Sequence, residues 1–421
     1  MLDFIWTFNR SVFVFFTVFY SFQILYTIIS LIFSLKKPEP SDKLHRYAVM
    51  IAARNEEKVI AELIRSIKAQ TYPQELIDIY VVADNCIDKT AQIAKDEGAE
   101  VIERHDLSLI GKGYALDYAF AVLKAQGKRK CYDGFFVFDA DNVLDENFIF
   151  EMNKMFGKGY RAITGYRNSK NFEDNWITSS YTLWFLREAA YLNKPRMILN
   201  TSCAISGTGY LVRADIIEKN DGWKYFLLTE DIEFNANCII DGEQIGYCED
   251  AVFYDEQPRK FKESWNQRLR WMKGTYQVLA KYGYALVSSM FKSKPLAKYD
   301  MLMTMAPALI VTFASASVNL VCLILAAFEN FKDIGIIALT AQSLLQSLIG
   351  FYFIFMGMAV LTVITEWRRI KAKPWRKIVS VFAFPFFIFT YIPISIIAIF
   401  KKVKWIPINH DVVKSAHDLS H

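Results

Sequence analysis

Long apolar stretches without charges lie at both ends of the chain, and shorter apolar runs separated by polar segments lie between them. Residues 12–33 form the first long stretch, which is uncharged and long enough to cross a bilayer as a helix. Lys36 and Lys37 follow it, and no small-residue cleavage site comes next, which argues against a secretory signal peptide. We therefore predict a transmembrane helix in residues 1–36, with the following chain on the cytoplasmic side.

The short apolar runs of residues 45–257 predict one α/β domain. Each run has the length of a buried parallel strand, and segments with helical spacing lie between the runs. The predicted strands cover residues 47–53, 77–84, 100–103 and 134–138, and the predicted helices include residues 61–67, 90–97 and 114–125. This alternation is typical of a mostly parallel sheet with helices on both faces, which binds ligands beyond the carboxyl ends of its strands.

An amphipathic pattern occupies residues 258–296. Apolar residues recur there at spacings of four and three, which predicts one apolar stripe along a helix. The stripe consists of Trp265, Leu269, Met272, Tyr276 and Leu279. Basic residues are available for the rest of the helix surface, so we expect this helix to lie on the membrane with its stripe toward the bilayer.

Two further long apolar stretches predict transmembrane helices in a C-terminal region of residues 300–405. They cover residues 301–328 and 334–365, and a short polar loop at residues 329–333 joins them. A cluster of basic residues follows at positions 368–377, and the positive-inside rule places this cluster in the cytoplasm.

The last apolar stretch, residues 378–400, has two interpretations. Basic residues flank both of its ends, and Pro385 and Pro393 interrupt it. Either it crosses the bilayer against the positive-inside rule, or it enters and returns as a broken helix. We expect the broken or re-entrant form, followed by a tail of residues 406–421.

The composition agrees with one soluble domain joined to membrane segments. Hydrophobic residues make up 53% and charged residues 22% of the 421 residues, which is too apolar for several soluble domains. The net charge of +5 is modest and no basic arm is present, so we expect no nucleic-acid partner. The six cysteines lack the spacing of metal ligands and predict buried, reduced thiols on the cytoplasmic side.

Asp139 and Asp141 directly follow the predicted strand 134–138. Two carboxylates separated by one residue can bind a hard divalent cation, which in turn can bind a diphosphate. Such triplets also occur by chance in polar loops, so the motif alone leaves both interpretations open. Its place at a strand end favours the metal site.

Two more polar side chains lie where predicted elements begin or end. Asp84 ends the strand 77–84, where its carboxylate can accept hydrogen bonds from a base or a ribose. A turn or helix cap is the alternative for Asp84. Lys112 lies between two glycines before a helix, where a lysine and backbone amides suit a diphosphate. A solvated turn lysine is the alternative there.

A general base can come from the segment that contains Glu230 and Asp231. Asp231 could take the proton from an acceptor hydroxyl as that oxygen attacks a sugar. Acidic residues at a helix N-terminus also interact favourably with the helix dipole, which is the alternative. Upstream, Gly207 and Gly209 form a turn that lets the backbone approach a ligand closely.

Gln267, Arg270 and Trp271 have the spacing of one helix face, which differs from the apolar stripe. Arg270 can hold a phosphate, and Trp271 can stack on a sugar ring. A membrane-surface aromatic anchor is the alternative for Trp271.

The ordered set of IAARNE, VVADN, GKGYAL, FDADN, TED and QRLRW resembles the family-2 inverting glycosyltransferases with a GT-A fold. Within them it resembles the membrane-bound synthases of cellulose, hyaluronan, chitin and poly-N-acetylglucosamine. The resemblance covers about residues 47–274. It implies a multi-pass protein of the cell membrane with a cytoplasmic GT-A domain.

The resemblance also implies a role for each matched residue. Asp231 would be the catalytic base, and Asp139 and Asp141 would bind Mg²⁺ or Mn²⁺ with UDP. The donor site would contain Glu56, Asp84, Lys112, Asp139, Gln267, Arg270 and Trp271. The acceptor site would contain Gly207, Thr208, Glu230 and Trp271.

Three functions are compatible with this resemblance. The first is a processive synthase that extends a cell-surface polysaccharide from a UDP-sugar, with UDP-glucose and UDP-N-acetylglucosamine as the leading donors, and passes it across the membrane. The second is a transferase that adds one sugar to a lipid, as ceramide glucosyltransferases do. The third is a sugar-binding or transport-related protein without catalysis, which the complete motif set disfavours. The bilayer is an expected partner, and a homo-oligomer is an alternative to a monomer.

Overall fold

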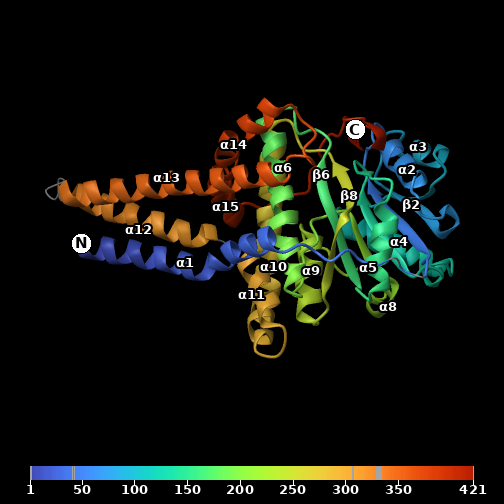
Figure 1. Cartoon of the computed structure of the whole chain (residues 1–421), viewed down its shortest axis with the longest axis horizontal. Helices are drawn as coiled ribbons and strands as arrows, with labels where there is room; N and C mark the ends of the chain where they lie inside the picture. The colour runs from blue at the N-terminus through green and yellow to red at the C-terminus, as the bar shows by residue number, and fades with distance from the viewer. Residues whose placement is uncertain (1, 40, 42, 306–307, 329–333, 421) are drawn as a thin grey trace.

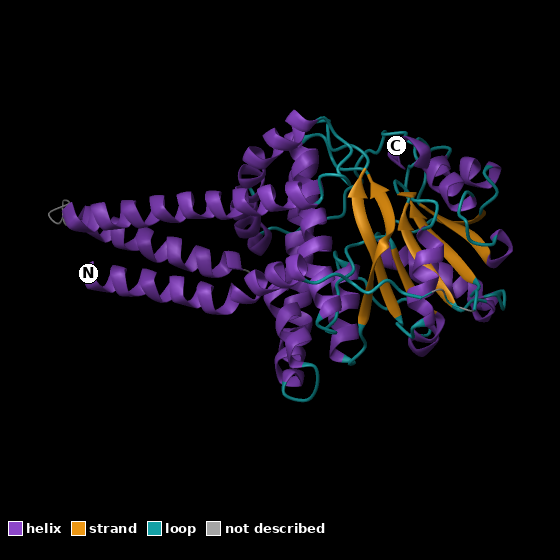
Figure 2. Cartoon of the chain, in the orientation of Figure 1, coloured by secondary structure: helices purple, strands orange, loops and turns teal. Residues whose placement is uncertain are grey.

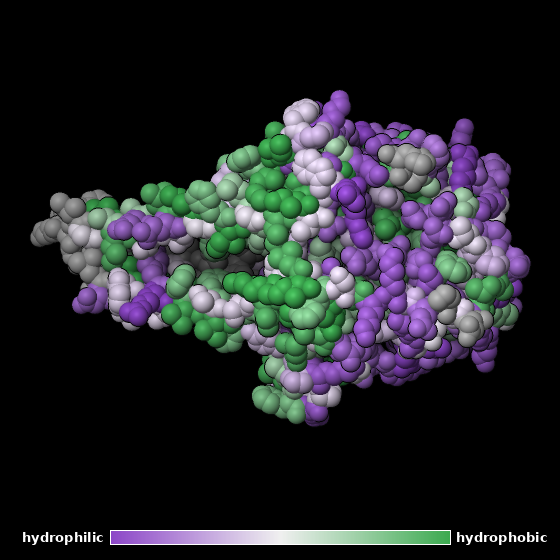
Figure 3. All heavy atoms as spheres, viewed as in Figure 1, coloured by the Kyte–Doolittle hydropathy of each residue, from purple (hydrophilic) through white to green (hydrophobic). Residues whose placement is uncertain are grey.

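A β-sheet domain and a group of long helices form the two halves of the molecule (Figure 1, Figure 2). The computed structural model describes residues 2–39, 41, 43–305, 308–328 and 334–420. Helices α1 (Leu2–Ile32), α12 (Ala308–Phe328) and α13 (Ile334–Thr365) lie side by side and extend away from the sheet. Hydrophobic residues gather on the helical half and hydrophilic residues on the sheet half (Figure 3).

The first half of the sheet is parallel, as the sequence predicts. It contains β1 (Tyr47–Ala53), β2 (Ile77–Asp84), β3 (Glu100–Arg104) and β4 (Gly134–Asp139). These strands lie in the order β3-β2-β1-β4 and all pair in parallel, so their carboxyl ends meet at one edge. The predicted strand positions match the observed ones within one residue at each end.

The second half of the sheet is mixed. Strand β7 (Tyr210–Arg213) is antiparallel to both β4 and β6 (Ala162–Ser169), and β6 is parallel to β8 (Ile245–Asp255). The short β5 (Val143–Leu144) pairs antiparallel with β8 at the edge. The strands β7, β6, β8 and β5 therefore extend the sheet beyond β4.

Helices cover both faces of the sheet, which confirms the predicted α/β class. Alternate residues of β1 point into two different hydrophobic cores, with Met50 in one and Val49 in the other. The first core contains α4 (Lys112–Ala125) and α6 (Trp176–Glu188), and the second contains α2 (Ile60–Lys68) and α5 (Phe148–Gly157). This domain also contains α3 (Thr90–Asp96), α8 (Ala214–Asn220) and α9 (Glu230–Ile240).

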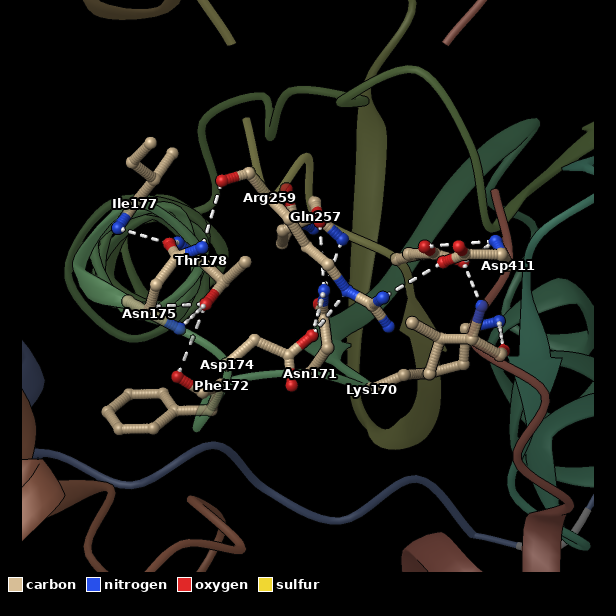
Figure 4. A network of polar contacts seen from close by, with 12 residues as sticks. Lys170, Asn171, Phe172, Asp174, Asn175, Ile177, Thr178, Gln257, Arg259 and Asp411 are labelled. Carbon is tan, nitrogen blue, oxygen red and sulfur yellow. Dashed lines mark hydrogen bonds and ion pairs between the residues drawn. The ribbon is translucent and has the colours of Figure 1, made fainter. Parts of the chain in front are cut away.

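A polar network anchors the start of α6 (Figure 4). The Asn175 side chain accepts hydrogen bonds from the amides of Ile177 and Thr178, which caps the helix. Arg259 donates to Asp174 at 2.6 Å and pairs with Asp411 of the C-terminal tail at 3.1 Å. The start of α6 is therefore tied to the tail as well as to the segment that follows β8.

The helix continues past α6 with a changed pitch. A π-helical turn, Ala189–Asn193, connects α6 to α7 (Lys194–Ile198). Arg196 of α7 donates two hydrogen bonds of 2.7 Å to Asp300, and the Tyr26 hydroxyl donates to the same carboxylate at 2.9 Å. This buried group connects α1 to the sheet domain.

Three described helices are long and apolar enough to cross a membrane, judged by length and composition: Asp3–Ile32, Ile337–Thr365 and Pro374–Phe400. The third consists of α14 (Pro374–Phe389) and α15 (Tyr391–Phe400), which are interrupted at Thr390. Pro385 and Pro393, where the sequence predicts interruptions, lie inside α14 and α15, and the broken or re-entrant form stays a prediction. The predicted polar loop at 329–333 lies outside the described residues.

The apolar stripe of helix α10 (Phe261–Met290) has a protein helix as its neighbour, and the predicted place of α10 on the membrane surface stays a prediction. The stripe packs against α15, where Leu269 lies beside Ile394 and Ala398. The Tyr276 hydroxyl also donates to the Ser395 carbonyl at 3.3 Å. The apolar stripe of α10 therefore has an apolar neighbour, and this neighbour is the protein helix α15. Helix α11 (Pro295–Met305) follows and packs against α10.

The cysteines form no disulfide among the described residues, in agreement with the predicted reduced thiols. Cys203, Cys238, Cys248 and Cys322 are buried, whereas Cys131 is exposed. Cys86 is half-buried, so the prediction of burial fails for Cys131 and holds only in part for Cys86.

Candidate active site

Several predicted site residues lie at or just beyond the carboxyl ends of the parallel strands. Glu56 follows β1, Asp84 ends β2 and Asp139 ends β4. Because β2, β1 and β4 are neighbours in the sheet, these side chains share one edge. These side chains therefore form one candidate site along this edge.

Lys112 joins the two sides of this site. Its ammonium group donates to Asp139 Oδ1 at 2.6 Å and to the Gly207 carbonyl at 2.7 Å. It is the first residue of α4, and Gly113 beside it allows a close approach, because a Cβ there would lie 2.0 Å from the Tyr225 carbonyl oxygen. Lys112 is therefore held between the Gly207 turn and the segment that contains Asp139 and Asp141, which we call the DxD.

The two aspartates of the DxD differ in environment. The Asp139 side chain is 42% exposed, whereas Asp141 is buried and accepts a hydrogen bond from the Glu256 amide at 2.8 Å. Burial raises the pKa of Asp141, but the charges of His410 and Lys170 outweigh it, so its pKa lies below the usual value. Asp141 therefore stays ionised.

Thr208 holds the DxD segment in place. Its hydroxyl oxygen accepts from the Asp139 amide at 2.8 Å, and the hydroxyl donates to Asn142. The residue is only 1% exposed. Thr208 thus positions Asp139, and its predicted contact with an acceptor stays a prediction.

Asp84 is held by a partner that the sequence did not indicate. Arg104, at the end of β3, donates to Asp84 Oδ1 at 2.6 Å, and Asn85 donates to the same oxygen at 2.9 Å. Burial raises the pKa of Asp84, while the Arg104 guanidinium lowers it. Both hydrogen bonds use one oxygen, so the other can accept a bond from a base or ribose.

Glu230 and Asp231 form an acidic pair at the start of α9, in which Glu230 is buried and Asp231 is half-buried. Burial and the neighbouring Asp231 raise the pKa of Glu230 to about 7. Burial also raises the pKa of Asp231, and Lys112 and Arg270 act in the opposite direction. A Cβ at Gly207 would lie 3.8 Å from Asp231 Oδ2, so the carboxylate faces the turn that Lys112 contacts.

Helix α10 approaches this acidic pair closely. A Cβ at Gly274 would lie 2.5 Å from the Thr229 hydroxyl oxygen, so only glycine fits there without movement. Arg270 donates to the Leu228 carbonyl at 3.3 Å, and Gln267 Oε1 is buried without a hydrogen-bond partner among the described residues. The predicted segment thus contacts the chain just before Asp231.

Trp271 lies against aromatic side chains of α6. Its ring centroid is 5.8 Å from Tyr181 and 6.3 Å from Phe185, both edge to face. Arg167 lies over the Phe185 ring at 3.6 Å and donates to the Ser206 carbonyl at 2.8 Å. Arg167 had no signal in the sequence, because only tertiary packing brings β6 to the Gly207 turn.

The C-terminal tail crosses the site. His410 Nδ1 is 3.0 Å from both carboxylate oxygens of Glu56, and the Asp411 amide donates to Glu256. Burial lowers the pKa of His410, but Asp141 and Glu56 outweigh it and raise the pKa to about 10. Trp405 lies 5.1 Å from the Arg54 guanidinium. Of these residues, only Glu56 and Asp141 were predicted from the sequence to belong to the site.

A cavity of about 110 Å³ lies between the tail and α10. Its basic lining residues are Arg270, Lys401, Lys402 and Lys404, and Gln267 also faces it. The concentration of positive charge suits an anionic ligand such as a diphosphate.

Residues 45–274 match the family described as "Glycosyltransferase like family 2". The chain belongs to this family. It is 27% identical over 252 residues to the probable glycosyltransferase YdaM of Bacillus subtilis. It is 26% identical over 274 residues to a beta-monoglucosyldiacylglycerol synthase of Trichormus variabilis, and 23% identical over 258 residues to a poly-beta-1,6-N-acetyl-D-glucosamine synthase of Staphylococcus epidermidis.

These matches cover 58–61% of this chain and 54–58% of the relatives. The chain therefore spans a little more than half the length of the curated relatives it matches. A mannosyltransferase from Pyrobaculum calidifontis, solved with GDP-Man and Mn²⁺, shares the fold with a TM-score of 0.50 and 14% identity, covering 80% of this chain and 98% of its own. The predicted GT-A fold and family-2 resemblance are confirmed.

Proposed function

We propose that this protein transfers a hexose or N-acetylhexosamine from a UDP-sugar to an acceptor at the cell membrane, with inversion of configuration. Its first candidate acceptor is a growing cell-surface polysaccharide, which it extends processively and passes across the membrane. Lys112 carries most weight in this proposal. Its ammonium group contacts both Asp139, on the proposed side of the sugar donor, and the Gly207 turn, which faces the proposed base Asp231. This contact supports the proposal that the sugar donor and the acceptor meet here.

The donor side is proposed to consist of Asp84 for the base and Lys112, Arg270 and Gln267 for the diphosphate. Arg104 and Asn85 both donate to one carboxylate oxygen of Asp84, so the other oxygen is available to accept a hydrogen bond from a base. The basic cavity beside Arg270 adds positive charge for the leaving nucleotide. Glu56 would act through His410, its direct partner in the tail.

Mg²⁺ or Mn²⁺ fits the carboxylates of the DxD. Among the described residues no group of three or more acidic, histidine or cysteine side chains could hold a metal. Hard cations are commonly held by one or two carboxylates together with substrate phosphates, which matches a partly exposed Asp139 and an ionised Asp141. When bound, the cation would neutralise charge on the leaving diphosphate.

Asp231 is proposed as the general base. It would take the proton from the acceptor hydroxyl while that oxygen forms the new bond to the anomeric carbon and the bond to UDP breaks. A pKa raised by burial makes its carboxylate a stronger base than a solvated aspartate. Trp271, packed on Tyr181 and Phe185, would stack on the acceptor sugar.

Transfer of a single sugar to a membrane lipid is the second candidate. It is favoured by the beta-monoglucosyldiacylglycerol synthase among the relatives, at an identity similar to that of the poly-N-acetylglucosamine synthase. The length of the product separates the two candidates. Purified protein with radiolabelled UDP-sugars should form a polymer ladder, whereas one lipid-soluble product would refute the polysaccharide proposal.

Asp231→Asn tests the catalytic assignment, with Asp215→Asn as the matched control. Asp215 also lies in the first turn of a helix, but its side chain is exposed and pairs with Arg161 on the surface. We expect Asp231→Asn to reduce transfer by about two to four orders of magnitude, the usual contribution of a general base. Asp215→Asn should retain full activity. Undiminished transfer in Asp231→Asn would show that the base is another group.

A further inference from the structure

Two buried guanidinium groups lie where the catalytic domain meets candidate membrane helices. Arg187 on α6 is 8% exposed and Arg268 on α10 is fully buried. Arg187 donates to Gln23 Oε1 of α1 at 2.9 Å, and this neutral amide is its hydrogen-bond partner among the described residues. Among the same residues, no carboxylate lies within ion-pairing distance of either arginine.

Two aromatic rings connect the arginines. Arg187 lies 5.5 Å from the centroid of Trp184, and Trp184 stacks on Tyr391 with centroids 6.2 Å apart. Arg268 lies 5.1 Å from the Tyr391 centroid on the other side. We call Arg187, Trp184, Tyr391 and Arg268 the arginine ladder. It joins α6, α10 and the α14–α15 break, and through Gln23 it reaches α1.

Not every guanidinium nitrogen of the ladder has a hydrogen-bond acceptor among the described residues. Arg268 donates to the carbonyls of Ser264 at 3.2 Å and Phe387 at 3.1 Å and to the Thr390 hydroxyl, but its Nη2 atom is buried and has no partner in the part of the chain that the structure describes. Burial lowers the pKa of Arg187 to about 10. The nearby Glu188 offsets part of this effect, but its carboxylate accepts the Ser206 hydroxyl at 2.5 Å.

Arg196, on the following helix α7, is a buried arginine whose charge is paired with a carboxylate. It is 2% exposed and donates two hydrogen bonds of 2.7 Å to Asp300, which is equally buried. A buried charge is normally paired in this way, because leaving it unpaired costs several kcal/mol. Arg187 and Arg268 lack such a carboxylate, so the ladder carries positive charge that the described chain does not neutralise.

We propose that the arginine ladder binds the phosphate group of a membrane lipid. Guanidinium groups form strong, paired hydrogen bonds with phosphate oxygens, and Arg187 makes a single hydrogen bond among the described residues, to Gln23. A lipid is the expected source because Gln23 and Tyr391 belong to the two candidate membrane segments Asp3–Ile32 and Pro374–Phe400.

The ladder also lies beside the acceptor end of the active site. Phe185, next to Trp184 on α6, packs against Trp271 with centroids 6.3 Å apart. A phosphate lipid held here is therefore a neighbour of the acceptor, and a lipid-linked acceptor would place its own phosphate on the ladder. This assignment rests on the proposed function only for the acceptor role, whereas lipid binding itself can be measured separately.

The test is lipid retention by the full-length protein in detergent, measured by native mass spectrometry. Wild type, Arg187→Gln, Arg187→Lys and Arg376→Gln are titrated with phosphatidylglycerol and, separately, with diacylglycerol. Arg376 is the matched control, because its guanidinium also stacks on a tryptophan, at 4.1 Å from Trp375, but it is exposed. We expect retention of phosphatidylglycerol by wild type and Arg376→Gln, and affinity about tenfold weaker in Arg187→Gln, as for the loss of one charge-assisted hydrogen bond.

The remaining variants and ligands separate the alternatives. Arg187→Lys keeps the charge and should retain the lipid better than Arg187→Gln, and diacylglycerol should bind equally to all four proteins. Unchanged phosphatidylglycerol affinity in Arg187→Gln, at an unchanged melting temperature, would overturn the proposal. Displacement of the lipid by inorganic phosphate would assign the ladder to free phosphate instead. If the wild-type protein retains the lipid but transfers no sugar from any UDP-sugar, the proposed function is refuted and the lipid-binding proposal stands.

Discussion

Replacement of Gly274 by alanine should separate the binding of substrate from its conversion. Gly274 lies on α10 one turn after Trp271, and the added Cβ would lie 2.5 Å from Thr229 Oγ1 and 2.8 Å from the Thr229 amide nitrogen. Because backbone is among the atoms met, rotation of one side chain cannot relieve the contact. Helix α10 must move by about 1 Å to restore an ordinary van der Waals distance.

That displacement acts on both sides of the proposed reaction. Thr229 directly precedes Glu230 and Asp231, while Gln267, Arg270 and Trp271 lie on the helix that moves. Overpacking of this kind costs about 1–3 kcal/mol of stability. A misplacement of about 1 Å between reacting groups can reduce turnover about a hundredfold. We therefore expect a large fall in kcat, with a melting temperature only a few degrees lower.

Gly283→Ala is the matched control on the same helix. Its Cβ would lie 3.2 Å from the Leu279 Cδ1 atom, the end of a flexible side chain that can move. Replacing a glycine inside a helix by alanine favours the helix by up to about 1 kcal/mol, so this variant should be as stable as wild type or more stable.

The measurements are turnover of the UDP-sugar, affinity for UDP and thermal unfolding, all on protein purified in the same detergent. Wild-type turnover in Gly274→Ala would refute the argument that α10 and the Thr229 segment must keep their present distance. An equal loss of turnover in Gly283→Ala would also refute it, because the effect would then come from the helix and not from the contact.

Two further predictions concern stability. The pKa of Glu230 is about 7 in the folded protein and 4.5 for the free side chain, so the folded protein binds this proton more tightly. The protonated Glu230 therefore contributes to stability fully below pH 4.5, and this contribution is lost as the pH rises through 7. The melting temperature of Glu230→Gln should therefore fall less than that of wild type between pH 5 and pH 8, by an amount corresponding to up to about 3 kcal/mol, and equal slopes would contradict the assignment. Asp300→Asn should lower the free energy of unfolding by about 3–5 kcal/mol, because it leaves Arg196 buried without its partner. Asp241→Asn, which removes a surface pair with Lys219, should change it by at most about 1 kcal/mol, and similar losses in the two variants would show that the Arg196 pair is not special.

The sequence predicted the parallel half of the sheet and the position of much of the site. Apolar runs of strand length marked β1, β2 and β4 because strands buried on both faces lack polar residues. The residues that end or follow those runs then had to meet at the carboxyl edge. The antiparallel β7 and the bulged pairing of β6 with β8 were not predicted, because the pairing partner of a strand depends on contacts far apart in the chain.

Local pattern also predicted that α10 has two faces, but not what each one contacts. The apolar stripe requires a nonpolar environment, and both lipid and α15 meet that requirement. Arg104 beside Asp84 and His410 beside Glu56 had no sequence signal either. Those pairs are 20 and 354 positions apart and carry no spacing rule.

The sequence by itself determined the apolar segments, the strand and helix runs of the catalytic domain, and the residue types that could act at the strand ends. These follow from periodicity and side-chain chemistry, which act over a few residues. Only the tertiary structure decided which charges are paired: Arg196 with Asp300, Lys112 with Asp139, and no carboxylate within ion-pairing distance of Arg187 among the described residues. The cost of a buried charge depends on every atom around it, and those atoms come from helices and strands that meet only when the chain folds.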